Sequence, residues 1–555
     1  MTDPSAEIKT VSFVSLGCPK NLVDSEHMLG ELASAGVAPV SAEDLGSGED
    51  DDLSLSGSEQ DASAAGGRIT PADAVVVNTC GFLEASKEES LAVIRDAIEA
   101  KKRGEVKRVV VAGCLVQRHR TKLFEWAPGI DAMIGVFDRD QVLEAVRGTP
   151  RETLEDAVAE GPKYWISANA LTKARSLGPG STTLTVNGKD GKGLGYHESD
   201  SARLRLTPRH YAYLRISEGC NQACAFCTIP SIRGKMRSKR EPAVVAEARE
   251  LMRDGARELL LIGQDTTSYG DDIGAGMNDA GEMFTAGLPK LLKSLSDAMD
   301  EEIGAAGWLR LMYAYPTTFT DPIIDAFAEL VANGRLLPYL DIPLQHASDN
   351  MLTSMRRNVG ASEQRELMLK LRERIPGMAI RTTFVTGFPG ETEEDHEELL
   401  GFIDEIGFDA VGVFRYSAEP GTPAATMEAD PALAVSRETK QRRHNEIMEL
   451  QQRIAFEQAE FLAEQFEADD PLDTGLRLDV VIDEPAQASA EAHTHRGRAY
   501  FQAPKIDATT YVVSSKPLEP GAVVPCVVTD SDGYDLIATP IADLAESSGA
   551  ARSSA

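Results

Sequence analysis

The chain has 555 residues, enough for three or four domains at about 150 residues each, so a single small module is excluded. Its 88 acidic and 56 basic residues leave a formal net charge of −32, which argues against a broad positive face for nucleic acid and favours a basic protein partner. No run approaches the ~18 apolar residues of a membrane span, and MTDPSAEIKT lacks the features of a signal peptide, so we expect a cytoplasmic protein.

Residues 8–147 are predicted to form an α/β domain with a parallel sheet. The strand-like runs FVSLGC, VVVNTC and VVVAGC alternate with the helical runs NLVDSEHMLGELASAG and EASKEESLAVIRDAIEAKK, a pattern typical of βαβ crossovers. Residues 41–68, rich in Gly, Ser, Ala and acids, predict a disordered insertion in a surface loop. We expect residues 148–208, which are rich in glycine and polar residues, to be an interdomain linker that could contain a hairpin.

Residues 209–430 repeat the alternation of strands and helices. Six strand-like runs, from YAYLRI to AVGVFRY, suit an α/β barrel, closed or open, with its site at the carboxyl ends of the strands. Residues 431–466 predict one long connecting helix, and the short runs RLDVVIDE, GRAYFQAP, TTYVVSS, AVVPCVVTDS and YDLIATPI within 467–540 predict a small β-barrel. Residues 541–555 are expected to be a disordered tail. The predicted fold class is a multidomain α/β protein with a small terminal β-barrel.

Seven cysteines in a large chain favour metal binding or catalysis over a disulfide scaffold. Cys220, Cys224 and Cys227 stand in GCNQACAFCTIP, directly after the first strand of the predicted barrel. Three thiolates on one loop can bind three irons of a [4Fe-4S] cluster and leave the fourth iron open for chemistry. Zinc is the alternative, but a structural zinc site usually needs four ligands and favours paired CxxC spacing.

This CxxxCxxC loop resembles that of the radical S-adenosylmethionine superfamily. The resemblance implies that the open iron binds the amino and carboxylate groups of S-adenosylmethionine, and that an electron from the cluster cleaves the cofactor to a 5′-deoxyadenosyl radical. Phe226 occupies a position that is aromatic in the superfamily, although simple loop packing explains this residue equally well.

A second group of cysteines, Cys18, Cys80 and Cys114, is scattered in the sequence, but each member ends a predicted strand. The carboxyl ends of parallel strands lie along one edge of a sheet, so the three thiols are expected to converge and could hold a second cluster. The alternative is three ordinary buried cysteines. The glycines of LGC and AGC, with Thr79, favour a cluster because they let the backbone approach an inorganic ligand closely.

Taken together, these features resemble the methylthiotransferase family over essentially the whole chain. The motifs SLGCPKNLVDSE, HYAYLRISEGCNQACAFCTIPSIRGKMRS, MYAYP, DIPLQHAS and FRYSAEPGTPA look like the branch that acts on an aspartate of small-subunit ribosomal protein twelve. The branch that modifies tRNA adenosines, which is the alternative, usually carries GCQMN and PVQSGS at the corresponding places. The long acidic insertion and the extended linker depart from the family pattern.

The resemblance implies two [4Fe-4S] clusters, with S-adenosylmethionine as both methyl donor and radical source. The second cluster would deliver sulfur to an unactivated C–H bond, so an electron donor and a sulfur source are expected as further partners. A non-enzymatic iron-sulfur protein is a third hypothesis, which predicts no cleavage of S-adenosylmethionine.

Several weaker signals allow a functional and an ordinary structural interpretation. Gly263, Gln264 and Asp265 end one predicted strand and Gly387 to Glu391 follow another, so both turns are candidates for cofactor contacts or for plain turn chemistry. His346 is a candidate for substrate contact or a satisfied structural histidine, and Cys526 is predicted to lie in the core.

Two charged regions complete the sequence analysis. A positive patch after the cluster loop is interpreted either as a contact for substrate acids or as a solvated loop. Its members are Arg233, Lys235, Arg237, Lys239 and Arg240. The terminal barrel resembles the TRAM module, usually an RNA-binding fold, but residues 467–540 hold 13 acidic and 5 basic side chains. This balance disfavours nucleic acid and favours a basic protein.

Overall fold

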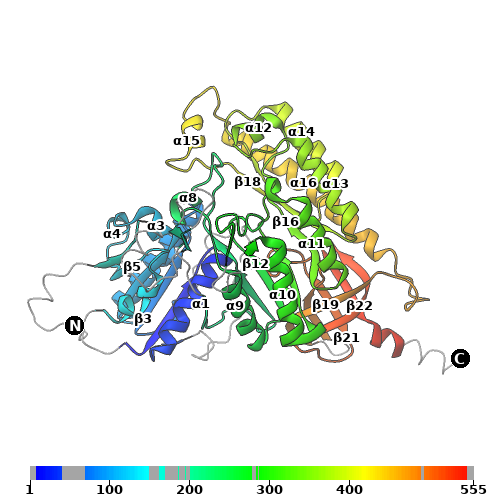
Figure 1. Ribbon diagram of the computed structural model, residues 1–555, viewed down its shortest axis with the longest axis horizontal. Coiled ribbons are helices and arrows are strands. Elements are labelled where there is room, and N and C mark those ends of the chain that lie inside the picture. The colour runs from blue at the N-terminus through cyan, green and yellow to red at the C-terminus, as the bar shows by residue number, and fades with distance from the viewer. Residues whose placement is uncertain are drawn as a thin grey trace, which may run out of the picture.

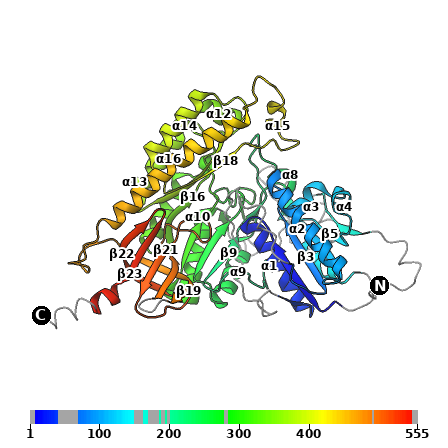
Figure 2. The same ribbon diagram turned by 180° about the vertical axis from the view of Figure 1, so that it is seen from behind.

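The computed structural model describes residues 8–40, 69–148, 162–168, 185–186, 194–195, 200–277, 283–285, 287–488 and 493–546. The predicted insertion at 41–68, most of the predicted linker and residues 547–555 lie outside these ranges. The amino-terminal domain and the terminal barrel lie on opposite sides of a central sheet domain (Figures 1 and 2). Among the described helices, none combines the length and the apolar character that crossing a membrane requires.

The amino-terminal domain is a six-stranded parallel sheet in the order β2-β1-β3-β4-β5-β6. Valines make its central strands, and alternate side chains are buried against helices on the two faces. The strands are β1 (Thr10–Ser15), β2 (Ala38–Pro39), β3 (Ala74–Thr79), β4 (Arg108–Gly113), β5 (Ala132–Ile134) and β6 (Lys163–Trp165). The helices are α1 (Pro19–Ser34), α2 (Glu84–Arg103), α3 (Cys114–His119), α4 (Lys122–Trp126), η2 (Arg139–Gln141) and α5 (Val142–Arg147).

This sheet extends beyond the predicted boundary at residue 147. Strand β6 comes from the predicted linker and pairs in parallel with β5. The linker also contains the hairpin that its composition allowed, because β7 (Thr185–Val186) pairs antiparallel with β8 (Leu194–Gly195).

The central domain is an open parallel sheet whose strands follow sequence order, β9-β12-β15-β16-β17-β18. Of the closed and open barrels that the sequence allowed, the structure has the open form. All six predicted strands are present: β9 (Tyr211–Arg215), β12 (Glu258–Ile262), β15 (Trp308–Leu311), β16 (Leu336–Asp341), β17 (Ala379–Thr386) and β18 (Ala410–Arg415). The accompanying helices are α9 (Glu241–Arg253), α10 (Leu288–Ile303), η3 (Gly304–Ala306), η4 (Pro316–Thr318), α11 (Asp321–Ala332), α12 (Asp349–Ser354), α13 (Ala361–Arg374), α14 (Glu393–Ile406) and α15 (Pro423–Glu428).

Short elements decorate the carboxyl ends of these strands. Strands β10 (Ser217–Glu218) and β11 (Arg237–Ser238) pair antiparallel on either side of the cluster loop and of α8 (Ile229–Ile232). A second small pair, β13 (Ala275–Met277) and β14 (Met283–Thr285), precedes α10.

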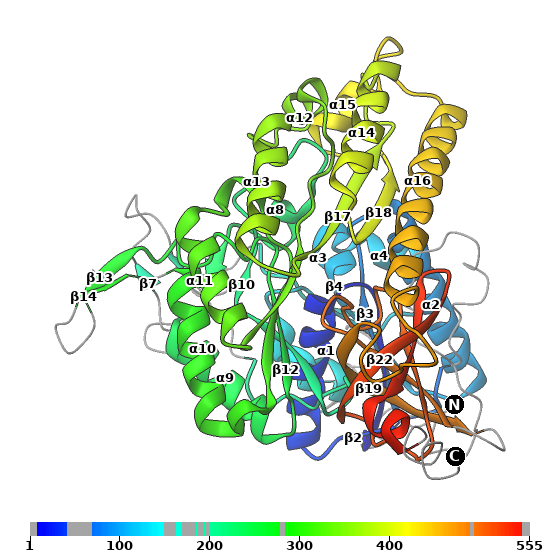
Figure 3. The same cartoon turned by 90° about the vertical axis from the view of Figure 1, so that its right-hand side faces the viewer.

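The predicted connecting helix is α16 (Arg437–Ala463), which runs along the central sheet beside β18 and reaches the terminal barrel (Figure 3). The barrel is closed by five strands in the order β19-β20-β21-β23-β22 and buries Cys526, as expected. Its strands are β19 (Arg477–Ala488), β20 (His493–Arg498), β21 (Thr510–Ser514), β22 (Val523–Asp532) and β23 (Asp535–Pro540).

Two details of the carboxyl-terminal region differ from the sequence prediction. The second barrel strand precedes most of GRAYFQAP, because a turn in which the Gln502 side chain accepts a hydrogen bond from Ala499 N at 2.8 Å ends the strand. Residues 541–546, predicted as the start of a disordered tail, are helical. Asp543 holds this helix to the barrel by accepting a 2.7 Å hydrogen bond from Ser515 N.

The barrel packs against the amino-terminal half of the central strands. Arg498 pairs with Glu258 at 2.9 Å, and His210 lies 2.7 Å from Asp483. Arg310 of β15 donates a 2.7 Å hydrogen bond to Tyr500 O. The barrel and the cysteine loop after β9 therefore lie at opposite ends of the central sheet.

Candidate functional site

The cysteine loop is fixed by its backbone and by donors to its sulfur atoms. Cys220 N donates to Gly234 O at 3.1 Å, which ties the loop to the segment before β11. Gln222 N donates to Cys220 Sγ, and Arg357 Nη1 donates to Cys224 Sγ, both at 3.4 Å. Such donors stabilise sulfur ligands that carry negative charge in a cluster.

Burial raises the pKa of the Cys220 thiol to about 11 and that of Cys227 to about 12. These thiols are therefore protonated at neutral pH until a metal displaces the protons.

The structure brings Cys18, Cys80 and Cys114 to the carboxyl edge of the amino-terminal sheet. Cys18 caps α1, Cys80 follows β3 and Cys114 begins α3. Gly17, at φ +88°, lies so close to Cys80 that a Cβ there would meet the Cys80 Cβ at 2.8 Å. A Cβ at Gly81 would meet the Cys114 carbonyl carbon at 3.0 Å. The two glycines therefore let these three strand ends approach one another closely, and the binding of a cluster by the three thiols stays a prediction.

No three His, Cys, Asp or Glu side chains in the described part of the chain are arranged as the ligand shell of a single metal ion. A cluster does not require that arrangement. Zinc–sulfur bonds of about 2.3 Å draw the ligands of one ion together, whereas each thiolate of an iron-sulfur cube binds its own iron. The donor chemistry of both triplets, three thiols at one edge or on one loop, fits a [4Fe-4S] cluster.

The two triplets belong to surfaces that pack on each other. Cys114 is buried in a small cluster with Val136, Phe137 and Ile232, and Ile232 lies only five residues after Cys227. Thr228 Oγ1 also lies 3.5 Å from Phe82 O, two residues after Cys80. The carboxyl edge of the first sheet therefore faces the cysteine loop of the second.

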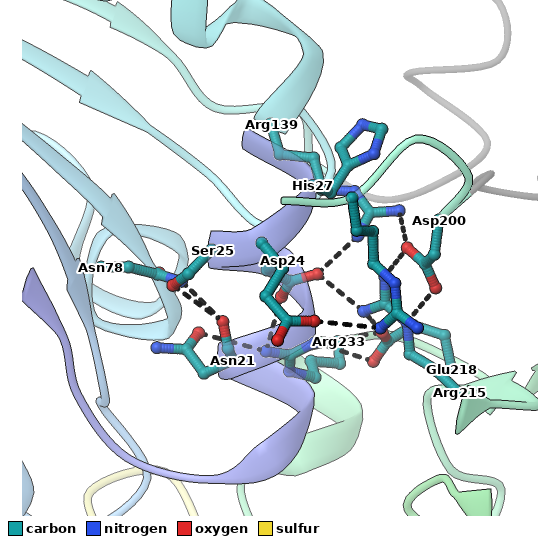
Figure 4. Close-up of polar contacts among 12 residues, drawn as sticks. Asn21, Asp24, Ser25, His27, Asn78, Arg139, Asp200, Arg215, Glu218 and Arg233 are labelled. Carbon is teal, nitrogen blue, oxygen red and sulfur yellow. Dashed lines mark hydrogen bonds and ion pairs between the residues drawn. The ribbon is translucent and has the colours of Figure 1, made fainter. Parts of the chain in front are cut away.

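A buried set of charges, which we call the interdomain ion network, joins the two domains beside the triplets (Figure 4). At its centre, Arg215 at the end of β9 contacts three carboxylates. Its guanidinium lies 2.7 Å from Asp24 of α1, 2.5 Å from Asp200 and 2.6 Å from Glu218. Burial alone would raise the pKa of Asp200, but Arg215 and Lys239 hold this pKa well below its usual range.

The remaining members balance the charge of the network. Arg139 lies 2.6 Å from Asp24 and 2.8 Å from Asp200. Arg233 contacts Asp24 at 3.1 Å and Glu218 at 3.0 Å. Lys239 pairs with Asp200 and, at 2.6 Å, with Glu247. The network holds four cations and four anions: Arg139, Arg215, Arg233, Lys239, Asp24, Asp200, Glu218 and Glu247.

The interpretation of residues 233–240 as a solvated basic loop is wrong for three of its five members. Arg233, Arg237 and Lys239 are 2 %, 8 % and 5 % exposed, whereas Lys235 and Arg240 are exposed. Arg237 donates to two backbone carbonyls and lies over the Phe137 ring. Burial against the first domain, which the sequence alone does not reveal, converts this segment into part of the interface.

The sequence analysis missed Asp24 and Asp200. Asp24 lies in an amphipathic helix where a charged residue is ordinarily solvated, and Asp200 lies in the predicted linker. A signal was present in NLVDSE, whose polar residues make the buried start of α1. There Asn78 Nδ2 donates to Ser25 Oγ at 2.8 Å, which fixes the helix to β3 (Figure 4). Asn21 Nδ2 donates to Leu16 O at 2.7 Å, which ties the helix to the residue that follows β1.

The predicted cofactor-contact turn after β12 is placed beside the cysteine loop. Gly263 leaves no room for a side chain, since a Cβ would lie 2.6 Å from Ser217 Oγ. Gln264 donates to Glu218 at 2.9 Å, and Asp265 accepts from Gln222 Nε2 at 2.9 Å and from Ser268 Oγ at 2.7 Å. These contacts position the loop, and a direct contact with cofactor stays a prediction.

The turn after β17 is largely self-contained. Gly387, at φ +72°, donates through its backbone N to Glu391, and a Cβ there would collide with Lys440 of α16. His346 is fully buried, and its Nε2 makes no hydrogen bond with the described residues and lies 3.8 Å from Glu391. Phe226 packs edge to face on Phe388 at 6.5 Å between ring centroids, as loop packing predicted.

Three family models match the chain. The model of the radical SAM superfamily matches residues 214–403, that of the TRAM domain matches 474–541, and that of uncharacterized protein family UPF0004 matches 57–135. The fold, the cysteine loop and these matches define a radical S-adenosylmethionine enzyme with an amino-terminal UPF0004 domain and a carboxyl-terminal TRAM barrel.

Full-length relatives narrow this class. The chain is 36 % identical over 528 residues to the ribosomal protein uS12 methylthiotransferase RimO of Desulforamulus reducens, covering 95 % of this chain and 98 % of that protein. It is 36 % identical to the protein of the same name from Trichlorobacter lovleyi, covering 95 % and 97 %. The chain therefore belongs to the ribosomal protein uS12 methylthiotransferase family.

Among solved structures, the chain is similar to the radical S-adenosylmethionine methyltransferase TsrM from Kitasatospora setae. The TM-score is 0.48 at 14 % identity, over 75 % of this chain and 74 % of that one.

Proposed function

We propose that this chain transfers a methylthio group to the side-chain carbon of an aspartate in ribosomal protein uS12. S-adenosylmethionine serves as the methyl donor and as the radical source. The observation that carries the proposal is the placement of two cysteine triplets on facing surfaces of two α/β domains, closed together by a buried ion network. Identity over nearly the whole length of named uS12 methylthiotransferases supports the same conclusion.

We assign the radical-generating cluster to Cys220, Cys224 and Cys227. When bound there, the cluster supplies the electron that cleaves S-adenosylmethionine. Gln222 N and Arg357 orient and stabilise the sulfur ligands by donating to them. Glu218, held by Arg215 and Arg233, and Gln264, which donates to Glu218, line the adjoining turn and fix its shape.

We assign a second cluster to Cys18, Cys80 and Cys114, as the site from which sulfur is delivered. Arg233 ties this edge to the cysteine loop, because its guanidinium bonds to Asp24 of α1 and Glu218 of β10. A one-electron donor and a source of reduced sulfur are required as further partners, and a ribosomal substrate assigns the reaction to the cytoplasm.

The choice of protein over tRNA is supported by the charge of the terminal barrel. Of its basic residues, Arg498 is buried against Glu258 and Asp483, and Arg496 pairs with Glu484. Few cations remain for a phosphate backbone, whose binding needs them.

The test is to incubate the anaerobically reconstituted enzyme, S-adenosylmethionine, a reductant and sulfide with uS12 or with tRNA. Mass spectrometry should find a methylthio gain on an aspartate of uS12 and none on tRNA. A gain on tRNA alone would reverse the substrate assignment. Cleavage of S-adenosylmethionine without modification of either would reject it.

A further inference from the structure

Lys20 is a buried cation at the junction of the two domains that the mechanism so far does not use. It lies in the first turn of α1, two residues after Cys18, and is only 7 % exposed. Its Nζ sits 3.3 Å from the centroid of the Tyr313 ring, which follows β15 in the central domain. Tyr313 has a positive φ of 60°, a strained conformation that places its ring at the carboxyl end of the central sheet.

Lys20 forms no ion pair with a carboxylate within the described part of the chain. Its Nζ forms no hydrogen bond and no ion pair there, and the contact with Tyr313 is its one close polar interaction. Of the groups whose charge favours the ammonium form of Lys20, the Cys18 sulfur has the largest effect, followed by the carboxylates of Asp341 and Glu218, which are engaged by arginines. Glu218 pairs with Arg215 and Arg233.

Asp341 accepts a 3.0 Å hydrogen bond from Arg381. It also accepts a hydrogen bond from Tyr313 N at 3.3 Å. Both carboxylates near Lys20 are therefore committed to other partners.

This arrangement leaves Lys20 without a carboxylate partner of its own within the described residues. Taking an ammonium group out of water costs several kcal/mol, whereas a cation–π contact returns about 0.5–2 kcal/mol. The neighbouring Arg215 and Arg233 each meet at least two carboxylates, so the fold pairs its other central cations here. Lys20 is thus poised to receive a negative group from outside the chain.

We propose that Lys20 binds the carboxylate of the target aspartate of uS12 and so positions the reacting carbon between the two cysteine triplets. The proposal rests on the function proposed above. An aspartate side chain has one carbon that carries hydrogen, and this carbon is bonded directly to the carboxylate. When Lys20 binds the carboxylate, it therefore also fixes the position of the C–H bond that must react. The lysine emerges from the turn that also holds Cys18, so the bound aspartate lies beside the assigned sulfur-delivering edge.

S-adenosylmethionine also carries a carboxylate that could bind Lys20. The experiment below distinguishes this carboxylate from that of the target aspartate. The variants are Lys20→Met, which keeps the length and removes the charge, and Lys20→Arg, which keeps the charge. Lys235→Met is the matched control, because it removes an exposed lysine from the central-domain segment that precedes β11. Each reconstituted enzyme is titrated with uS12 and with uS12 in which the target aspartate is asparagine.

Because Lys20→Met removes a hydrogen bond between charged groups, we expect it to weaken binding of native uS12 about 10- to 100-fold. Binding of the asparagine form should not change, so the variant loses the discrimination that the wild type shows. Lys20→Arg should restore part of this discrimination. The dissociation constant of S-adenosylmethionine and its cleavage without uS12 should equal those of Lys235→Met, and iron content and melting temperature verify folding.

Two outcomes overturn the proposal. Equal binding of the aspartate and asparagine forms by the wild-type enzyme would show that no carboxylate is recognised. Loss of S-adenosylmethionine binding in Lys20→Met, with unchanged affinity for uS12, would assign the lysine to the cofactor. Neither outcome touches the proposed function, which fails only if the wild-type enzyme leaves uS12 unmodified.

Discussion

The two cysteine triplets reach similar chemistry by opposite routes. Cys220, Cys224 and Cys227 lie within eight residues of one loop. Cys18, Cys80 and Cys114 come from three strand ends spread over nearly a hundred residues, and parallel pairing of β1, β3 and β4 brings them together. The first site is formed by one short segment of the sequence, whereas the second site forms only when the sheet brings three strand ends together. Damage to the sheet or to the interface should therefore affect the second site more than the first.

The largest effect is expected from the local triplet. Cys220→Ala, Cys224→Ala or Cys227→Ala should each lower the iron content from about eight to about four atoms per chain and abolish cleavage of S-adenosylmethionine, because one thiolate ligand of the radical cluster is lost. Iron analysis and chromatographic detection of 5′-deoxyadenosine measure this. Cys526→Ala is the matched control, since that thiol is buried in the distant barrel. Cleavage retained in any of the three variants would contradict the assignment.

Replacing Cys18, Cys80 and Cys114 together should separate the two sites. Iron should again fall by about half, but 5′-deoxyadenosine should still form because the radical loop keeps its ligands. Methylthiolated uS12 should not appear in the mass spectrum. If this triple variant made full product, the amino-terminal cysteines would be ordinary core residues despite their convergence.

The contrast also explains which features could be predicted from the sequence. The alternation of strand-like and helical runs predicted all six central strands, and their order along the sheet follows the chain. The strand-end rule placed Cys18, Cys80 and Cys114 at one edge, since parallel strands share direction. Strand positions and strand direction are local or topological properties, and the hydrophobic pattern of the sequence is enough to predict them.

The sequence pattern does not predict which charged residues pair when they lie far apart in the chain. Asp24 and Asp200 come from a helix and a predicted linker, and each becomes a partner of Arg215 only when the two domains pack. The burial of Arg233 and the unpaired state of Lys20 depend on the same packing. Interface electrostatics therefore had to come from the structure.

The interdomain ion network gives the next effect in size. Arg215→Met should lower the free energy of unfolding by about 3–5 kcal/mol, because it leaves buried carboxylates unpaired. Chemical denaturation at pH near 7 measures this. Arg253→Met is the control, because it removes an exposed arginine whose surface pair with Glu302 should leave stability nearly unchanged. Equal stability of Arg215→Met and wild type would mean that the network does not hold the domains.

The stability difference between wild type and Arg215→Met should also depend on pH. Although burial alone would raise them, the surrounding cations hold the pKa values of Asp200 and Glu218 well below their usual range. Their stabilising contribution is therefore present above the unfolded-state pKa of about 4 and is lost as pH falls below it. The gap in melting temperature between wild type and Arg215→Met should therefore stay near its full size from about pH 7 to about pH 5 and narrow as the pH falls below about 4. A constant gap would show that these carboxylates do not titrate with folding.

The smallest effect concerns the terminal barrel, which lies far from both triplets and which we expect to dock the basic substrate protein. Asp530 and Asp532 are exposed on β22 and available to a partner. Asp535 also belongs to this acidic group, but it accepts a 2.7 Å hydrogen bond from Thr509 N, so its replacement would disturb the fold. The structure therefore selects Asp530→Lys/Asp532→Lys as the variant.

This double variant should slow association with uS12 severalfold at low salt and leave cleavage of S-adenosylmethionine unchanged, because exposed charges act mainly on encounter. The difference should fade towards 1 M salt, where the Debye length falls to about 3 Å. Stopped-flow association at several salt concentrations measures it. Glu329→Lys/Glu373→Lys, which reverses two exposed acids of the central domain, keeps the net charge matched. If both double variants slow association equally, the barrel is not the docking surface, and its acidity acts only through the total charge of the chain.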